Sequence, residues 1–391
     1  MYLSKIVNHA QEQLRASDVG GWLLYDYMGM NSIFWDTVGP LQNVTRPCWL
    51  WIPKSGEPQL LVSYVDQGRF QHLGLDIKLW ASRSQMISIL KDMLAVSKSV
   101  AMEYSPSGEL PRVSKVDAGT IELVRSLGVE IVSSADTLQY ATQRWTDADL
   151  ESHKLAASKL DMIVQEAFHL IGRQLNSPIT EYDVASFIRE RFVQEGLEVT
   201  DGPIVAVNAH AADPHFDPVG TDVFTIKSGD WVLIDLWARM LGEGNMFADI
   251  TWVAFVGDRV PRRHQLVFDA VTGGRDAAVS ALEQAFVEGK MVQGWEIDKV
   301  ARDHIANCGF GKYFTHRLGH SLGHNVHSNA VNLDSFETRD TRRITSGLAV
   351  TVEPGIYIPG EFGVRSEIDV FVSDDGPCIT TEVQRKVVLI G

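Results

Sequence analysis

The chain has few of the features that mark secreted or membrane-bound proteins. Its three cysteines, Cys48, Cys308 and Cys378, are far apart, and an odd, scattered set does not predict a disulfide framework. No apolar run approaches the roughly 20 residues that a membrane helix needs. The first residues lack an apolar core followed by a small-residue cleavage site, so no signal peptide is expected. We therefore predict a cytoplasmic protein with no membrane partner.

Positive charge is also scarce. The sequence has 35 Lys and Arg against 50 Asp and Glu, a net charge of −15. Nucleic acids and anionic membranes are bound by clustered Lys and Arg, so neither is expected as a partner. The hydrophobic content of 45% is ordinary for a globular protein, and 391 residues are enough for two domains with separate cores.

The first part of the chain alternates short strand and helix patterns. Strands are expected at 21–27, 46–53, 58–65, 99–104 and 129–134, with helical stretches between them. The sequence KSGE separates the second and third of these strands and predicts a hairpin turn. These patterns predict a small α/β domain over residues 1–145.

The pattern changes after this point. Thr146 is followed three residues later by Asp149, and Thr180 by Asp183, and each pair resembles a capping box at the start of a helix. Further helices are expected at 264–288 and 296–307, and strands at 204–208, 231–238, 247–256, 348–353 and 363–372. Residues 146–391 are therefore predicted to form an α+β domain with antiparallel strands.

Two predicted hairpins each carry two acids. In 230–258 the turn falls near Gly242, and Asp235 and Asp249 each lie seven positions from that residue. Without a bulge, the two carboxylates would be direct cross-strand neighbours on one face.

The second hairpin, 351–373, turns at Pro359-Gly360. Glu353 and Glu367 each lie seven positions from Gly360 and would face each other in the same way.

Paired carboxylates in apolar strands repel each other. The acids could instead occupy exposed strand positions, share a proton, or bond to Arg365, and these readings stay open from the residues alone. Divalent cations would also remove the repulsion, because two of them balance the charge of four carboxylates.

The stretch THRLGHSLGHNVHSNA, residues 315–330, holds four of the twelve histidines, His316, His320, His324 and His327. Their spacing would place them on one face of a helix. Gly319 and Gly323 interrupt that pattern, since glycine is costly inside a helix and suits a chain that bends closely around a site. HRLGH also lacks the glutamate of the zincin motif HExxH. Alone, these histidines are weak evidence for a metal site.

Together, the strings IDLWA and ADIT, LGHSLGHNVH, TVEPGIY and GVRSE resemble the pita-bread metallopeptidases. That family includes prolidase, Xaa-Pro aminopeptidase and methionine aminopeptidase. The resemblance covers about residues 150–391, with the segments in the family's order. Residues 1–145 resemble the amino-terminal domain of creatinase and of the prolidase branch. The resemblance thus implies a creatinase-like amino-terminal domain followed by a pita-bread catalytic domain over 146–391.

The resemblance implies a site for two divalent ions. In the family the first Asp chelates one metal, the second Asp and the last Glu bridge both, and the His and the remaining Glu complete the other metal's shell. The implied ligands are Asp235, Asp249, His320, Glu353 and Glu367. This oxygen-rich set with one imidazole favours Mn²⁺, with Co²⁺ or Zn²⁺ as alternatives.

Other positions match the family's active-site residues. His327 matches a group that contacts the reacting carbonyl, and His215 a substrate-facing histidine, while His316, Tyr357 and Arg365 match substrate-binding positions. His324 matches no functional position and is expected to be structural.

There are three departures from the family's pattern. Ser321 replaces the usual glycine after the ligand histidine, and Ser328 replaces a common acid. The loop between the two aspartates is also slightly longer than is typical.

The resemblance implies hydrolysis of the Xaa-Pro bond of dipeptides or peptide amino-termini. A metal-bridging hydroxide would attack the carbonyl while Glu353 transfers the proton, and the metals and His327 would stabilise the oxyanion. A small peptide substrate and a homodimer are expected. Two alternatives are a metal-dependent lyase or hydrolase acting on a non-peptide substrate, and a non-catalytic binding protein on the same scaffold.

Overall fold

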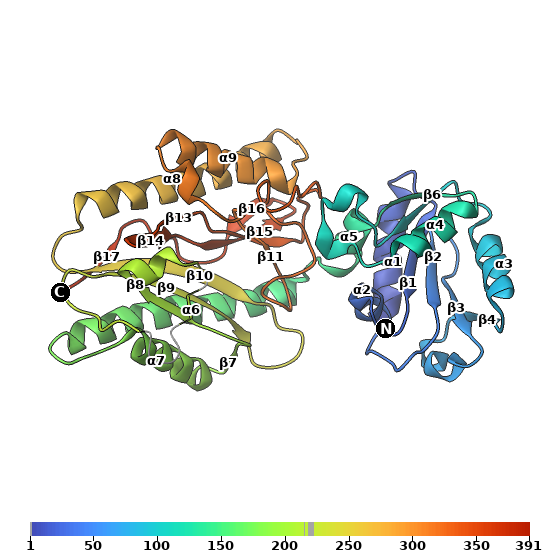
Figure 1. The fold of residues 1–391 in the computed structure, drawn as a ribbon, viewed down its shortest axis with the longest axis horizontal. Coiled ribbons are helices and arrows are strands. Elements are labelled where there is room, and N and C mark those ends of the chain that lie inside the picture. The colour runs from blue at the N-terminus through green and yellow to red at the C-terminus, as the bar shows by residue number, and fades with distance from the viewer. Residues whose placement is uncertain (1, 215, 218–222) are drawn as a thin grey trace. The chain divides into compact units, whose positions relative to one another are not determined.

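The computed structural model describes residues 2–214, 216–217 and 223–391. The chain divides into two compact units, Met1–Arg144 and Trp145–Gly391, and each contains its own hydrophobic clusters (Figure 1). Among the described residues, no helix is both long and apolar enough to cross a membrane.

The first unit is built on one mixed sheet with strand order β4-β3-β2-β1-β5-β6. Its strands are β1 (Gly21–Asp26), β2 (Cys48–Pro53), β3 (Gln59–Ser63), β4 (Asp76–Trp80), β5 (Ser99–Met102) and β6 (Glu130–Ser133). Its helices are α1 (Tyr2–Arg15), α2 (Ser32–Val38), α3 (Arg83–Leu94), α4 (Ala118–Ser126) and α5 (Ala135–Thr142). The antiparallel pairing of β2 with β3 confirms the predicted hairpin, and the α/β character of this part is confirmed as well.

The second unit opens with two helices whose starts were visible in the sequence. Both α6 (Asp147–Gln174) and α7 (Glu181–Gln194) begin with a complete capping box, in which a threonine side chain and an aspartate side chain satisfy each other's backbone N–H groups. The helices α8 (Arg262–Val287) and α9 (Gly294–Asn307) lie within two residues of the predicted bounds.

In the described part of the second unit, the strands form three sheets, and every pairing except that of β10 with β17 is antiparallel. The first holds β7 (Leu197–Glu198), β8 (Ile204–Val207), β9 (Trp231–Met240), β10 (Ala248–Val256) and β17 (Val388–Ile390); the second holds β11 (Ser321–Leu322), β12 (Ala349–Val352), β15 (Ile368–Ser373) and β16 (Gly376–Ile379); the third holds β13 (Gly355–Ile358) and β14 (Phe362–Arg365). The prediction of an α+β domain is therefore confirmed.

Helices cover both sides of these sheets (Figure 1). On one side, α6 and α7 pack on β9 and β10 through a cluster that includes Val232, Ile234 and Leu236. On the other side, Trp231 and Leu233 belong to the cluster that also contains α8, α9 and β12 to β15. Because successive strand residues point to opposite faces, Asp235 lies on the same face as Trp231 and Leu233. Its carboxylate is thus directed toward the second and third sheets.

The register of the first acidic hairpin differs from the prediction. Asp235 pairs with Thr251, and Asp249 pairs with Trp237, so the two acids are not directly opposite. The turn is centred on Glu243 rather than Gly242, which shifts the pairing by two residues. A two-residue shift keeps every side chain on its original face, so the acids remain diagonal neighbours.

The second acidic hairpin is interrupted at the acids. β13 pairs with β14 and β12 pairs with β15, and both ladders keep the register centred on Gly360. Glu353 and Glu367 lie in the gap between these ladders, outside the named strands. The predicted register is correct, but the prediction that both acids belong to continuous strands is wrong, since Pro354 cannot donate a backbone hydrogen bond there.

Candidate metal centre and active site

The five candidate ligands come together at the floor of a cavity of about 1010 Å³ in the second unit. The side chains that line this floor are Asp235 of β9, Asp249 of β10, His320 from the segment before β11, Glu353 after β12 and Glu367 before β15. Four of the five residues are buried, and Glu353 is partly buried. The fold thus gathers acids from two hairpins and one imidazole from a third segment.

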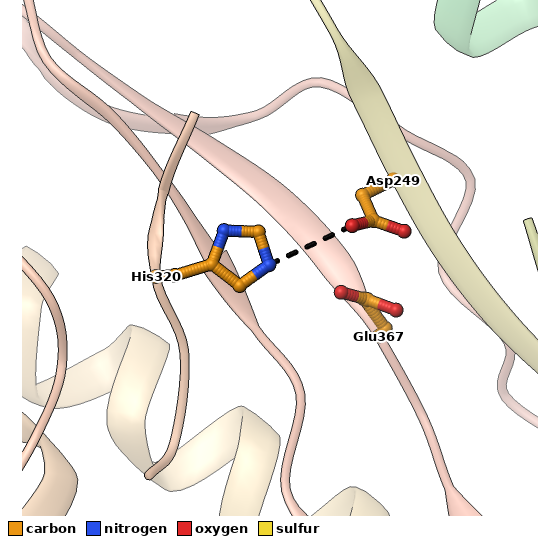
Figure 2. A group of neighbouring side chains, drawn as sticks. All are labelled: Asp249, His320 and Glu367. Atoms are coloured by element: carbon orange, nitrogen blue, oxygen red, sulfur yellow. Dashed lines mark ion pairs between the residues drawn. The ribbon is translucent and has the colours of Figure 1, made fainter. Parts of the chain in front are cut away.

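Three of these side chains converge most closely. Figure 2 shows Asp249, His320 and Glu367 pointing toward one another, and their potential ligand atoms all lie within 4.8 Å of each other. The Nε2 atom of His320 lies 3.6 Å from Oδ2 of Asp249 and 3.5 Å from Oε1 of Glu353. These separations leave room for a cation between the groups.

Asp235 is held by a buried arginine rather than by the imidazole. Arg365 donates from Nη2 to Oδ2 of Asp235 and from Nε to the Thr251 hydroxyl at 2.9 Å. Thr251 in turn donates to Oε2 of Glu367 at 2.7 Å. One arginine and one threonine therefore connect the carboxylates of both hairpins.

The charge on these acids is poorly compensated by the protein. Burial, reinforced by the neighbouring carboxylates, raises the pKa of Asp249 and of Glu367 well above their ordinary values. Burial also raises the pKa of Glu353 to about 7, and raises that of Asp235 although Arg365 opposes the shift. Such a set disfavours four simultaneous negative charges unless cations are bound.

Two orphaned atoms show that the residues fit a divalent ion. Oδ1 of Asp235 and Oδ1 of Asp249 are buried and have no hydrogen-bond partner among the described residues. A buried carboxylate oxygen without a partner is costly, and coordination of a cation would satisfy it. Carboxylate oxygens and one imidazole nitrogen are also a donor set that divalent metals accept.

The ligand histidine is oriented by its own neighbours. Nδ1 of His320 lies 3.3 Å from the Ser321 carbonyl oxygen, so this nitrogen is the donor and Nε2 is left as an acceptor. Its backbone N–H donates to Thr351 at 2.9 Å, and the Thr351 hydroxyl donates to Oε1 of Glu353 at 3.1 Å. The tautomer and the ring position both suit metal ligation through Nε2.

His316, which is partly buried, and Tyr357, which is buried, form a second pair beside Arg365. Nδ1 of His316 lies 2.6 Å from the Arg317 carbonyl oxygen, and Nε2 lies 2.8 Å from the Tyr357 hydroxyl. Burial, and then the charge of Arg365, lowers the pKa of His316 to about 3, while burial raises the pKa of Tyr357 to about 12. Neutral His316 therefore accepts a hydrogen bond from the Tyr357 hydroxyl, which itself accepts from Arg365 Nη1 at 3.0 Å.

The predicted substrate-facing residues have different positions. His316, His327 and Arg365 line the cavity, and the ring of His327 lies 4.3 Å from that of His320, centroid to centroid. Tyr357 is buried behind this wall. His215 lies outside the described residues.

The histidine stretch is not helical. Residues 314–330 follow an irregular course apart from β11 and an isolated bridge between Gly319 and Leu333, so the alternative of one helix face is wrong. A side chain at Gly319 would meet the Thr351 carbonyl oxygen at 2.0 Å, which explains the need for glycine at this close approach. His324, predicted to be structural, is exposed at the cavity wall.

Ser321, one departure from the family's pattern, has a structural contact. It is fully buried and donates from its hydroxyl to the Ala330 carbonyl oxygen at 3.2 Å. Its backbone oxygen also accepts from the Ser328 N–H at 2.9 Å. Ser321 thus ties together the two ends of the turn that carries His327.

Two residues of α9 that were not predicted from the sequence clamp the backbone around His316. Arg302 donates to the carbonyl oxygens of Phe314 at 3.0 Å and His316 at 2.8 Å. Asp298 binds the Arg302 guanidinium and accepts the Leu318 N–H at 2.8 Å. The pair fixes the backbone on both sides of His316. An Asp–Arg pair four residues apart was a visible signal of a helix-surface ion pair, but its backbone targets were not.

A second missed residue lies behind the metal ligands. Asp369 on β15 accepts the backbone N–H of Asp249 at 2.9 Å and thereby links β15 to β10. It is completely buried, and burial raises its pKa well above the ordinary value. Nearby, His153 of α6 lies 3.9 Å from the Asp369 carboxylate.

Comparison with known proteins places this site in a recognised family. Residues 152–374 match the family model for metallopeptidase family M24. An uncharacterised peptidase of Staphylococcus saprophyticus is 29% identical over 257 residues, which are 65% of this chain and 67% of the relative. An uncharacterised peptidase of Bacillus subtilis is 33% identical over 232 residues, 58% of this chain and 60% of the relative.

Solved structures share the fold along nearly the whole chain. The dipeptidase PepE from Mycobacterium ulcerans has a TM-score of 0.72 and 23% identity, and covers 100% of this chain and 98% of its own. A Xaa-Pro dipeptidase from Bacillus anthracis has a TM-score of 0.64 and 21% identity, with 99% of each chain covered. An X-Pro aminopeptidase from Thermotoga maritima has a TM-score of 0.57 and 23% identity, covering 97% and 99%. The fold resemblance to the pita-bread enzymes is therefore confirmed.

Proposed function

The chain belongs to metallopeptidase family M24, and on that premise we propose that it hydrolyses the Xaa-Pro bond of short peptides with two divalent metal ions. The observation that carries this proposal is the buried group of four carboxylates and one imidazole at the floor of the cavity. The orphaned oxygens of Asp235 and Asp249 support it, because they are the atoms that a bound cation would satisfy.

The donor set fits two ions better than one. Asp249, His320 and Glu367 converge on one point, whereas Asp235 lies on the Arg365 side of the site. Asp249 is the diagonal cross-strand neighbour of Asp235, and Thr251 links Glu367 to Arg365, so both acids also adjoin the Asp235 side of the site. Bridging by Asp249 and Glu367 would account for the full set, and its many oxygen donors favour Mn²⁺.

Bound cations would activate a water molecule and polarise the scissile carbonyl. Glu353 lines the cavity beside His320 and is the group we assign to accept the proton of the attacking water and return it to the leaving nitrogen. His327 lines the same wall and would donate to the developing oxyanion. Arg365 and Thr251 hold the carboxylates in place during these steps.

The experiment combines metal removal with two glutamate variants. Protein treated with a chelator should lose hydrolysis of Ala-Pro and Ala-Pro-Ala, and Mn²⁺ should restore it more fully than Co²⁺ or Zn²⁺. Glu353→Gln should lower kcat by about 10²- to 10⁴-fold, because a positioned proton-transfer group contributes about that much. Glu361→Gln makes the same change at the exposed tip of the β13–β14 hairpin and should leave kcat unchanged.

Two results would contradict the proposal. Equal activity of Glu353→Gln and Glu361→Gln would remove the proton-transfer role. If metal binds but neither peptide is cleaved, the protein acts on a non-peptide substrate or only binds a ligand, and Xaa-Pro hydrolysis is wrong.

A further inference from the structure

Among the described residues three arginines line the cavity, and in two of them every guanidinium nitrogen has a protein partner. Arg365 uses all three of its guanidinium nitrogens for Asp235, Thr251 and Tyr357. Each nitrogen of this guanidinium therefore already donates to a protein group.

Arg239 is engaged in a similar way. Its Nε and Nη2 atoms each lie 2.7 Å from Oε1 of Glu198, and Nη1 donates to the His324 carbonyl oxygen at 2.9 Å. A substrate anion would have to break a close ion pair to bind here.

Arg317 is the exception. Its guanidinium makes one hydrogen bond to the described residues, from Nη1 to Oε2 of Glu337 at 3.3 Å, and its Nε atom is buried without a partner. The Arg317 and Glu337 side chains are 24% and 42% exposed, so this long pair contributes little stability. Of the three cavity arginines, Arg317 therefore has the fewest hydrogen bonds from its guanidinium to the described residues.

Arg317 also lies in the cavity that holds the proposed reacting groups. It follows His316 directly in the chain and lines the same cavity as Glu353 and His327. Burial raises the pKa of Glu353, and the charges of Arg365 and then of Arg317 oppose that rise. An anionic group bound at Arg317 would therefore lie in the cavity that also holds Glu353 and His327.

We propose that Arg317 binds the C-terminal carboxylate of a Xaa-Pro dipeptide and so makes this site a dipeptidase site rather than an aminopeptidase site. The inference rests on the proposed hydrolysis of Xaa-Pro bonds. In a dipeptide the carboxylate is attached to the same proline whose nitrogen is released, so it must lie close to the cleaved bond. In a longer peptide that position is occupied by an uncharged amide.

Guanidinium and carboxylate are suited to each other in this role. Arginine can offer two parallel N–H donors to one carboxylate, which adds geometric selectivity to the charge attraction. The contact that Arg317 would give up is a single long hydrogen bond to Glu337. The exchange therefore favours the substrate carboxylate over the existing partner.

The experiment compares a free carboxylate with a neutral end group. Mn²⁺-loaded wild-type protein and the variants Arg317→Gln and Arg239→Gln are assayed with Ala-Pro, Ala-Pro-NH₂ and Ala-Pro-Ala. Wild-type protein should cleave Ala-Pro with a kcat/KM about 10- to 100-fold above that for Ala-Pro-NH₂, the range expected of one charge-assisted pair. Arg317→Gln should remove this preference mainly by raising KM for Ala-Pro, and Arg317→Lys should restore part of it.

Arg239→Gln is the matched control, because it removes a cavity arginine that Glu198 already engages. It should leave the ratio between acid and amide substrates unchanged, whatever its effect on the absolute rates. Proline should also inhibit wild-type protein more strongly than prolinamide, and this difference should vanish in Arg317→Gln.

The outcomes separate the two proposals. If Ala-Pro and Ala-Pro-NH₂ are cleaved equally well, or if Arg317→Gln slows both equally, Xaa-Pro hydrolysis stands and the role of Arg317 is wrong. If none of the three substrates is cleaved by the metal-loaded wild-type protein, the proposed function and this inference both fail.

Discussion

Replacing Asp249 by asparagine should affect the metal-free and metal-loaded proteins in opposite directions. The substitution removes a buried negative charge while nearly keeping the shape of the side chain. In the metal-free protein this charge is unfavourable, because Asp249 lies near Glu367, Asp235 and Asp369 and its Oδ1 atom has no hydrogen-bond partner among the described residues. In the metal-loaded protein the same carboxylate is a ligand.

The size of the expected Tm difference follows from the Oδ1 atom of Asp249, which has no hydrogen-bond partner among the described residues. A buried polar group without a partner costs about 1–3 kcal/mol, and a domain of this size changes its Tm by roughly 3 °C per kcal/mol. Chelator-treated Asp249→Asn should therefore unfold about 3–9 °C above chelator-treated wild-type protein near pH 8. With Mn²⁺ present the order should reverse, because wild-type protein gains binding energy that the variant lacks.

Differential scanning calorimetry with and without chelator measures both states, and metal content is determined on the same samples. The higher Tm of chelator-treated Asp249→Asn over chelator-treated wild-type protein should diminish toward pH 4. Because the pKa of Asp249 is raised, the folded wild-type protein already holds this acid in its neutral form at pH 4. If Asp249→Asn lowers the Tm equally in both states, Asp249 is an ordinary structural residue and the reasoning is refuted.

Two further predictions concern residues that support the site. Arg302→Gln should raise KM for Ala-Pro about 10-fold without changing metal content, because the backbone around His316 loses two hydrogen bonds from Arg302. Arg302→Lys should recover part of this loss. A parallel drop in metal content would show that Arg302 supports the whole fold instead. Burial lowers the pKa of His153 to about 4, so between about pH 6.5 and 4 the unfolded chain binds a proton that the folded chain does not. The free energy of unfolding of wild-type protein should therefore fall over that pH range by about 2 kcal/mol more than that of His153→Gln. Urea titrations of both proteins measure this difference. Identical pH dependence in both proteins would contradict the second prediction.

The helices of the second unit could be predicted accurately because their signals are local. Thr146 and Thr180 each meet an aspartate three residues later, and the capping boxes form as the spacing indicates. Such signals depend only on neighbours in the chain, so no tertiary contact is needed to interpret them.

The acidic hairpins show where local reasoning is insufficient. The turn after β9 contains Gly242 and Gly244, both with positive φ, and the sequence does not tell which residue is central. The error was two residues, and since side chains alternate with a period of two, Asp235 and Asp249 still share a face. A one-residue error would have separated them.

The hydrogen bonds that support the site from distant segments could not be predicted. Asp298 and Arg302 reach the backbone at 314–318, and Asp369 reaches the backbone of Asp249, through packing that no spacing rule describes. The single guanidinium hydrogen bond of Arg317 likewise became informative only by comparison with the several bonds of Arg239 and Arg365.

The proposed function requires that two divalent ions bind together to Asp235, Asp249, His320, Glu353 and Glu367. A crystal of the protein grown with Mn²⁺ and measured at the manganese absorption edge tests this directly. We expect two anomalous peaks, with Asp249 and Glu367 contacting both. A map without a peak among these five side chains, at full Mn²⁺ saturation of the solution, would contradict the account.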